Sequence, residues 1–303
     1  MDRLDQLYTD LTKGCPDLEL LKNEPMARHT TFRIGGPVPL MARPATEEQA
    51  VACVKLARER EVPLVVLGNG SNLLVADEGV QAFVVDMTGL NRLERTGERE
   101  ITAGAGVTLA RLASFAAGEG LAGLEFASGI PGTLGGGVLM NAGAYGGEMV
   151  QVVRRTRYLT PEGAVKEAVG EEHDFSYRHS VFSQGENVIL SSVLELEPDN
   201  PEDIRARMAE LAQKRKTKQP LEYPSAGSMF KRPKGYFAAA LIEQCGLKGF
   251  AVGGAQVSEK HAGFVINRGN ATCADVLSLV KEVQRRVKEQ TGVELEMEVR
   301  RLG

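Results

Sequence analysis

Apolar and polar residues alternate along the chain with two different periods, and these predict strands and helices in turn. Thr46 and Gln49 have the spacing of a helix capping box, and Thr108 can cap a second helix that ends near Gly118 or Gly120. Short apolar runs between turn residues indicate buried strands. In this part of the chain the expected elements are helices after 46 and 108 and strands at 62–67, 83–85 and 101–107.

The second half of the chain begins with a mostly extended pattern from 154 to 196, with a turn signal at 161–163. Asn200-Pro201 then opens a helix that is expected to link two domains and to end in the basic run 214–218. Beyond this helix the expected elements are a helix ending at Gly246, strands near Ala251 and Phe264, a helix from about 274 to 290 and a last alternating strand from 293 to 299.

Two glycine-rich loops each follow an apolar run, the first at 68–74 and the second at 128–147. Glycine lacks a Cβ and permits positive φ, so backbone N–H groups can face an anion at close range. The first loop lacks the usual dinucleotide fingerprint, because Leu73 stands where its third glycine would be, and the P-loop sequence Gly-x-x-x-x-Gly-Lys-Ser/Thr occurs nowhere in the chain. One such loop alone could be only a turn. Two of them, both with Ser and Asn donors, favour a diphosphate-containing cofactor.

Composition narrows the class of protein. The chain has 303 residues and is 43% hydrophobic, which suffices for two or three domains. It lacks an apolar run of about 18 residues, and its acidic N-terminus has no apolar core, so neither a membrane span nor a secretory signal is expected. Four scattered cysteines indicate reduced thiols in a cytosol, and the dispersed histidines argue against a metal site. The net charge of −4 argues against nucleic acid as the main partner.

Several longer motifs accompany the two loops in a fixed order. LGNGSNLLV and SGIPGTLGGGVLMNAGAYGGE occur with TTFRIGG near Thr30, SYRHSVF around Arg178, PSAGSMFKRP around Ser228 and LEMEVRRLG at the C-terminus. Together they resemble the UDP-N-acetylenolpyruvoylglucosamine reductase (MurB) family over nearly the whole chain. The resemblance implies a cytoplasmic flavoprotein oxidoreductase of peptidoglycan synthesis. In this reaction NADPH reduces FAD, and reduced FAD converts the enolpyruvyl ether of a UDP-sugar to the lactyl ether of UDP-N-acetylmuramate.

The resemblance also implies the fold, a mixed α/β and α+β chain. Two lobes of the vanillyl-alcohol-oxidase (PCMH) type, at 1–90 and 91–200, are expected to bind FAD, and a smaller α+β domain at 201–303 is expected to bind substrate. Its last strand would return to the active site. The short stretch 220–228 leaves little room for an insertion, which is typical of the family's shorter form (type II), with a more open substrate cleft.

The implied cofactor site uses residues of both loops. Because 68–74 and 128–147 contain neither His nor Cys, covalent attachment to the flavin is not expected there. The expected FAD-binding residues are Gly68, Asn69, Gly70, Ser71, Asn72 and Leu73 in the first loop and Ser128, Gly129, Ile130, Pro131, Gly132, Thr133, Gly135, Gly136, Asn141, Ala142 and Gly143 in the second.

Three residues are expected to be catalytic. Considered alone, Ser228 after a glycine is typical of a turn, Arg178 of a surface arginine stacked on Tyr177, and Glu298 of a solvated strand face. The family motifs instead make Ser228 the proton donor. They make Arg178 and a protonated Glu298 the groups that stabilise negative charge spreading onto the substrate carboxylate.

Basic residues lie on both sides of Ser228 in the sequence. At the end of a helix such residues need no function, because they complement its dipole. The resemblance aligns Lys218 and Arg232 with contacts to the substrate phosphates. Some members of the family have Asn at the second position.

Two alternatives remain open from the residues. One is an oxidase or dehydrogenase of alcohols with the same two-lobed FAD fold. The other is a non-catalytic sensor of flavin or UDP-sugar. Enzymes of the first kind often carry a histidine in the first glycine loop that bonds covalently to flavin, and this loop has none. Bleaching of the flavin by NADPH and its recolouring by substrate would distinguish the reductase from the sensor.

Overall fold

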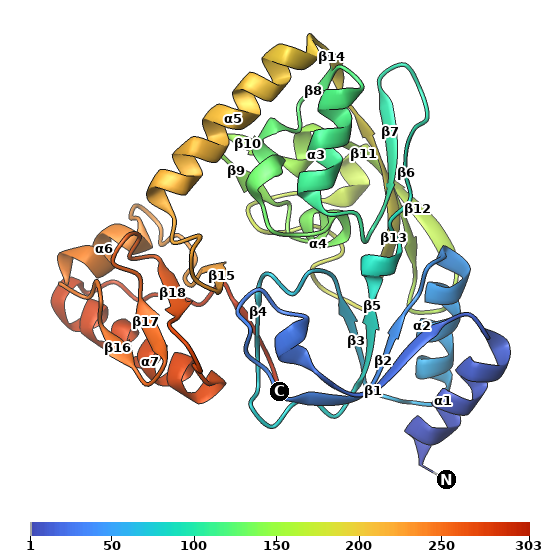
Figure 1. Cartoon of the computed structure of the whole chain (residues 1–303), viewed down its shortest axis with the longest axis horizontal. Helices are drawn as coiled ribbons and strands as arrows, with labels where there is room; N and C mark the ends of the chain where they lie inside the picture. Colours follow the sequence, from blue (N-terminus) through green and yellow to red (C-terminus); the bar gives the residue numbers. More distant parts are fainter. Residues whose placement is uncertain (1) are drawn as a thin grey trace. The chain divides into compact units, whose positions relative to one another are not determined.

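The computed structural model describes residues 2–303, which form two compact units, each built from several stretches of sequence (Figure 1). The first contains Met1–Lys22, Leu40–Asn69 and Ala82–Lys214, and the second contains Asn23–Pro39, Gly70–Gln81 and Arg215–Gly303. The chain therefore passes from one unit to the other after Asn69, inside the first glycine loop. This division differs from the three predicted parts, because it groups Asn23–Pro39 and Gly70–Gln81 with the C-terminal part of the chain. The predicted boundaries stay a prediction.

The first sheet has the strand order β1-β2-β5-β3, and β5 runs parallel to both β2 and β3. Its strands are β1 (Glu19–Pro25), β2 (Pro37–Arg43), β3 (Leu64–Leu67) and β5 (Phe83–Asp86). Helix α2 (Glu47–Glu59) packs against β3 and β5, and α1 (Arg3–Gly14) packs against α2. The predicted cap of α2 is confirmed, because the Thr46 hydroxyl accepts a hydrogen bond from the Gln49 N–H.

The second sheet has the order β12-β11-β13-β7-β6 and is antiparallel throughout. Its strands are β6 (Leu93–Arg95), β7 (Glu100–Gly104), β11 (Val153–Leu159), β12 (Val165–Val169) and β13 (Val188–Glu195). Helix α3 (Leu109–Gly118) is capped by Thr108 as predicted, and α4 (Leu134–Leu139) packs against β7 and β13. Short pairs join β8 (Leu121–Ala122) to β14 (Glu197–Pro198) and β9 (Gly143–Ala144) to β10 (Gly147–Glu148).

The second unit contains an antiparallel sheet of order β15-β18-β17-β16. Its strands are β15 (Ser225–Ser228), β16 (Ala251–Val252), β17 (Ala255–Val257) and β18 (Phe264–Asn267). Helix α7 (Cys273–Thr291) covers β16 and β17 with a buried stripe that includes Val276, Val280 and Val283, and α6 (Ala238–Gln244) packs against α7. A separate parallel pair joins β4 (Leu73–Val75) to β19 (Arg300–Leu302).

Helix α5 (Pro201–Lys218) ends at the last residue of the basic run, as predicted, and it includes the run because Lys and Arg are good helix formers and are favourable at a helix C-terminus. Two other predictions about secondary structure were wrong. The stretch 170–187 is a loop rather than a strand. The last strand is regular only at 300–302, since the chain changes its pairing partner just before that point.

Within residues 2–303, no helix combines the length and the apolar character needed to cross a bilayer.

Candidate active site

The two glycine loops lie against each other in the first unit. The Asn69 side-chain amide donates to the Pro131 carbonyl over 2.6 Å. A Cβ added to Gly68 would lie 2.4 Å from the Thr133 hydroxyl, so only glycine permits this approach. Residues sixty positions apart in the sequence therefore form one backbone-lined surface, as the resemblance to an FAD site implies. The space beside Gly136 is nearly empty, because a Cβ added there would have only Thr133 Oγ1 within 4 Å, at 3.7 Å.

Other glycines of the second loop serve packing. The Gly135 N–H donates to the Ala105 carbonyl over 2.9 Å, and a Cβ at Gly135 would lie 3.0 Å from the Ala105 Cβ. Gly137 similarly approaches the Leu109 side chain. These contacts hold α4 against the turn after β7 and against the start of α3, which gives the loop a fixed base. Gly135 was also predicted to bind the cofactor, and that contact stays a prediction.

Asn141, also predicted to bind the cofactor, is buried and hydrogen-bonded within the protein. Its amide nitrogen donates to the Glu148 carboxylate and to the Ser176 carbonyl, both over 3.1 Å. Its amide oxygen accepts from the Val150 N–H over 3.0 Å. These three bonds use both amide hydrogens and one lone pair. The contact with Ser176 reaches the loop that carries Arg178, so Asn141 anchors that loop, and its contact with the cofactor stays a prediction.

Arg178 lies in a tight turn with left-handed backbone, at φ +56°. Ser176 and His179 exchange two backbone hydrogen bonds of 3.1 Å across the turn. The Arg178 guanidinium lies 5.2 Å from the centre of the Tyr177 ring, which is 55% exposed. A non-glycine residue in this region is uncommon and requires support from its surroundings.

Two serines and a buried histidine supply that support. The hydroxyls of Ser180 and Ser183 both donate to the Leu139 carbonyl at the end of α4, over 2.8 and 2.6 Å. The His173 ring contacts the Gly170 carbonyl and the Thr156 hydroxyl, at 2.8 and 2.9 Å. Burial lowers the pKa of His173, which favours the neutral ring at pH 7. No pattern in the sequence indicates these long-range contacts.

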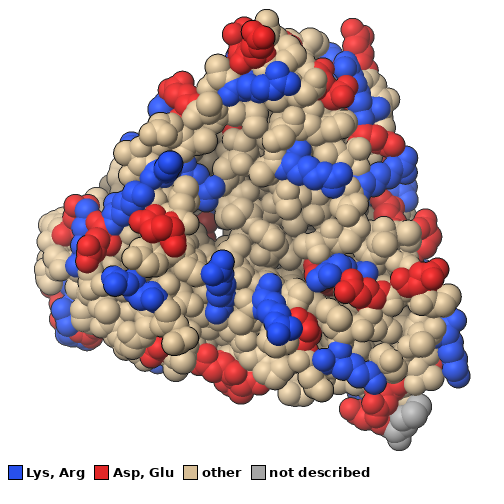
Figure 2. All heavy atoms as spheres, viewed as in Figure 1, with Lys and Arg blue, Asp and Glu red and all other residues tan. Residues whose placement is uncertain are grey.

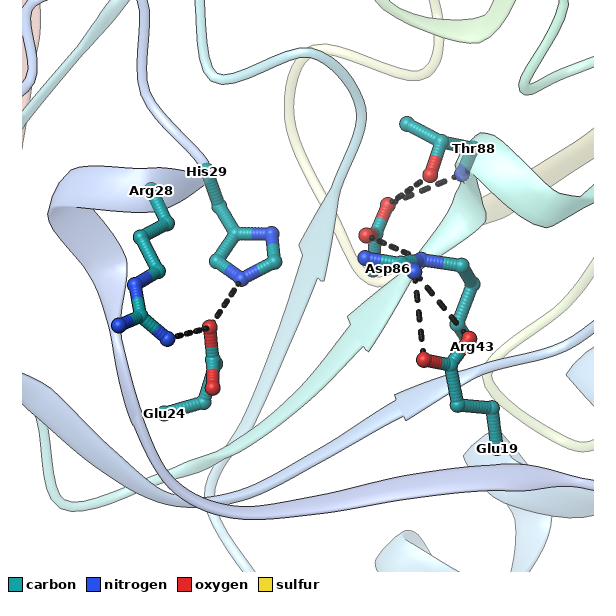
Figure 3. A network of polar contacts seen from close by, with 7 residues as sticks. All are labelled: Glu19, Glu24, Arg28, His29, Arg43, Asp86 and Thr88. Carbon is teal, nitrogen blue, oxygen red and sulfur yellow. Dashed lines mark hydrogen bonds and ion pairs between the residues drawn. The ribbon is translucent and has the colours of Figure 1, made fainter.

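In the second unit, the rest of the first glycine loop rests on residues 29–31. A Cβ at Gly70 would lie 2.1 Å from the His29 carbonyl oxygen, and Gly70 itself has φ +56°. The Thr31 hydroxyl donates to the Ser225 carbonyl at the start of β15, over 2.7 Å. The Glu24 carboxylate lies 3.0 Å from His29 Nε2 and also contacts Arg28, and Figure 3 shows how these three side chains face one another. Residues 29–31 thus connect the glycine loop to the strand that ends at Ser228.

A second polar network in Figure 3 belongs to the first unit. The buried Asp86 accepts from Arg43 Nε over 3.0 Å, and its other oxygen accepts from the Thr88 N–H and hydroxyl. Arg43 also contacts Glu19. This network fixes the turn after β5 and contains none of the predicted site residues, so we assign it to the fold.

Ser228 is the exposed last residue of β15, opposite Phe264 on β18. Gly227 precedes it with φ +78°, and a bulge interrupts the register between Ser225 and Ser228. The next residue, Met229, is buried and donates its N–H to the Gly263 carbonyl over 2.8 Å. A buried neighbour on one side and a glycine on the other hold the serine hydroxyl at the surface of the unit.

Glu298 is joined to this strand end through Met229. The Glu298 N–H donates to the Met229 carbonyl over 2.9 Å, and Phe230 pairs with Met297 in an antiparallel bridge. The structure therefore places the Glu298 backbone beside Met229, the residue that follows Ser228. Glu294 and Glu296 are exposed and form ion pairs with Lys288 and Lys231. Of the three glutamates that the alternating pattern groups on one face, only Glu298 is partly buried.

The predicted phosphate-binding residues occupy different surroundings. Lys218 is exposed at the C-terminal end of α5. The Arg232 guanidinium lies over the Phe237 ring at 4.0 Å, and its Nε donates to the Tyr236 carbonyl over 3.4 Å. On the face of residues 2–303 seen in Figure 2, basic and acidic side chains are interspersed rather than gathered by sign. An anionic ligand would therefore depend on a few local cations.

Within residues 2–303, no three His, Cys, Asp or Glu side chains converge as a metal site would require. The cysteines Cys15, Cys53, Cys245 and Cys273 are all thiols. Burial raises the pKa of the Cys53 thiol to about 12, so this side chain is a neutral member of the core.

Two protein families and several known proteins match this chain. Residues 38–168 match the FAD binding domain family, and residues 219–302 match the family of the UDP-N-acetylenolpyruvoylglucosamine reductase C-terminal domain. A UDP-N-acetylenolpyruvoylglucosamine reductase of Agathobacter rectalis is 49% identical, with 97% of each chain covered. One of Caldanaerobacter subterraneus is 47% identical, covering 99% of this chain and 98% of its own.

Solved structures agree with these matches. The crystal structure of UDP-N-acetylenolpyruvylglucosamine reductase from Thermus caldophilus superposes with a TM-score of 0.80 at 37% identity, covering 94% of this chain and 99% of that one. An alkyldihydroxyacetonephosphate synthase, at 20% identity and a TM-score of 0.51, shares the fold over 64% of this chain. The predicted fold class, a two-lobed FAD-binding fold followed by a smaller α+β domain, is confirmed.

Proposed function

Because the chain belongs to the UDP-N-acetylenolpyruvoylglucosamine reductase family, we propose that it reduces the enolpyruvyl ether of UDP-N-acetylglucosamine-enolpyruvate to UDP-N-acetylmuramate, with FAD as cofactor and NADPH as hydride donor. The observation that carries this proposal is the Glu298 N–H bond to the carbonyl of Met229, the residue next to Ser228. It places an acidic side chain and a hydroxyl on adjoining backbone in the unit that contains residues 70–72. We further propose that the reaction takes place in the cytoplasm.

The two glycine loops fit the diphosphate of FAD. Their contact at Gly68 and Thr133 leaves a surface of backbone groups and short polar side chains, and a side chain at Gly68 would abolish it. We assign the backbone of both loops, with the side chains of Ser71 and Ser128, to the cofactor. The Ser128 hydroxyl donates to the Glu125 carbonyl over 2.7 Å, so it would have to rotate away from this carbonyl in order to donate to a phosphate.

The hydride for the terminal carbon of the enolpyruvyl double bond would come from reduced FAD held by the two glycine loops. Negative charge would then develop on the adjacent carbon and its carboxylate. Arg178 would hold this carboxylate by paired N–H donors, and the Glu298 carboxyl would stabilise the same charge. Ser228 would then deliver a proton to the adjacent carbon, which becomes the new stereocentre.

The spectrum of the purified protein tests this proposal. Under anaerobic conditions, we expect NADPH to bleach the flavin absorbance and the enolpyruvyl UDP-sugar to restore it, because the two half-reactions share one cofactor. Acid precipitation should leave all flavin in the supernatant. Bleaching without recolouring would favour a sensor, and recolouring by an alcohol-derived carbonyl compound instead would favour an oxidoreductase of another substrate.

Lys218→Ala is expected to weaken binding of the UDP-sugar while leaving flavin reduction by NADPH nearly unchanged. A charge-assisted contact to phosphate contributes roughly 1.5–3 kcal/mol, enough to raise the apparent KM about tenfold or more. Steady-state kinetics with varied UDP-sugar measure this effect. The matched control is Lys216→Ala, which removes another exposed lysine of α5. If the KM rose equally in both variants, the effect would come from the general charge of the helix, and Lys218 would not be a specific contact.

A further inference from the structure

The chain around Glu298 changes its pairing partner. Residues 296–298 lie antiparallel to 229–231, with the Lys231 N–H donating to the Glu296 carbonyl over 2.8 Å. Residues 300–302 instead run parallel to β4, which follows the first glycine loop. Between these two pairings only Val299 is buried. A peptide at such a change of partner has lost the regular neighbours of both ladders, so its orientation needs another hydrogen bond.

Asn72 supplies that bond. Its side-chain amide donates to the Glu298 carbonyl over 3.2 Å, and its own carbonyl accepts from the Arg300 N–H over 3.0 Å. At the far end of the parallel pair the Ala76 N–H donates to the Leu302 carbonyl over 2.9 Å. In the same parallel register, the position four residues before Ala76 is Asn72 and the position four residues before Leu302 is Glu298. There the Asn72 side-chain amide donates to the Glu298 carbonyl, in place of the main-chain N–H that a regular ladder would use.

We infer that Asn72 is a positioning residue, which orients the Glu298 peptide for the reduction of the substrate rather than serving only to bind the cofactor. The inference rests on the proposed function of Glu298. The Glu298 peptide is then held on both sides, by Met229 through its N–H and by Asn72 through its C=O. In the same loop, Asn69 donates to Pro131, so the two asparagines have different partners.

This arrangement requires an amide at position 72. An aspartate in its place could not donate, and its charge would face a carbonyl oxygen. Alanine would leave the Glu298 carbonyl without this donor and let the peptide rotate. A displacement of about 1 Å in a catalytic group can lower a rate by about 100-fold, whereas the flavin would keep its backbone contacts.

The test is a double-mutant cycle of Asn72→Ala and Glu298→Gln in the FAD-loaded protein. Alone, Asn72→Ala is expected to slow reoxidation of the flavin by the UDP-sugar roughly 10- to 100-fold, with reduction by NADPH and flavin content within about twofold of the parent.

In the Glu298→Gln background, Asn72→Ala should slow reoxidation by less than about threefold, because the effects of two residues that act through one group are not additive. The pH profile of reoxidation should also change in Asn72→Ala. The control is Glu294→Gln, an exposed glutamate of the same segment, which should leave the rates unchanged.

Additive effects in the cycle, or loss of flavin and slower reduction by NADPH in Asn72→Ala, would overturn the inference and assign Asn72 to the cofactor alone. Hydrogen exchange gives a second readout that does not depend on activity. Asn72→Ala should speed amide exchange at 297–302, and unchanged exchange there would also contradict the inference. A parent protein that fails to recolour with the UDP-sugar would instead reject the proposed function.

Discussion

Ser228→Ala is expected to separate the two half-reactions of the enzyme. Reduction of the flavin by NADPH needs no proton from this hydroxyl, so its rate should stay close to that of the parent. Reoxidation by the enolpyruvyl substrate should slow about 10²–10⁴-fold, because a positioned proton donor is lost and water must replace it. Stopped-flow absorbance of the flavin measures both rates separately.

The matched control for this variant is Ser225→Ala, at the other end of β15. The Ser225 backbone carbonyl accepts a hydrogen bond from the Thr31 hydroxyl, and Ser225→Ala keeps this bond because it changes only the side chain. Ser225→Ala should therefore leave both half-reactions unchanged. Equal slowing of the two halves in Ser228→Ala would indicate a structural serine, and normal reoxidation would remove Ser228 from the catalytic residues.

Gly70→Ala is expected to destabilise the protein and to abolish flavin binding. The new Cβ would lie 2.1 Å from the His29 carbonyl oxygen, at a backbone φ of +56°. Main-chain atoms cannot rotate away as a side chain can, so the loop and residues 29–31 must separate. The expected cost is at least about 3 kcal/mol in the free energy of unfolding, measured by denaturant titration of the flavin-free protein.

Gly246→Ala is the control that separates the cost of the steric clash from the cost of the left-handed backbone. Gly246 has φ +68° but no atom within 4 Å of an added Cβ, so only the left-handed backbone is penalised. We expect a loss of about 1–2 kcal/mol and normal flavin content for this variant. If Gly70→Ala cost no more than Gly246→Ala, the close approach to His29 would not matter, and the loop would be more adaptable than the structure indicates.

The sequence predicted well those elements that short-range rules determine. The caps at Thr46 and Thr108 and the turn after Thr160 depend on residues at most four positions apart, and all are present. The adjacency of the two glycine loops could be predicted only through the resemblance, because no local rule connects Gly68 with Thr133.

The predictions that were wrong or missing depend on tertiary contacts. Alternation alone predicted a strand over 293–299, but the chain there exchanges one partner for another, which periodicity cannot register. The bonds of Asn141 to Glu148 and Ser176 likewise join separate segments. No local pattern in the sequence indicates these bonds, and whether Asn141 also contacts the cofactor stays a prediction. The roles of all the predicted catalytic, cofactor-binding and phosphate-binding residues likewise stay predictions.

The parallel pairing of β4 with β19 joins strands that the ribosome synthesises at very different times. Asn72 and Glu298 are 226 residues apart, so at roughly 5–20 residues per second β4 leaves the ribosome about 10–45 s before its partner exists. During this interval the strand after the first glycine loop has an unpaired edge, and Glu298 has not yet been added. A pairing of such long range forms late, because the entropy of closing the intervening loop must be offset first. The glycine surface for the cofactor can therefore form in the nascent chain before the acid that completes the reducing site is translated.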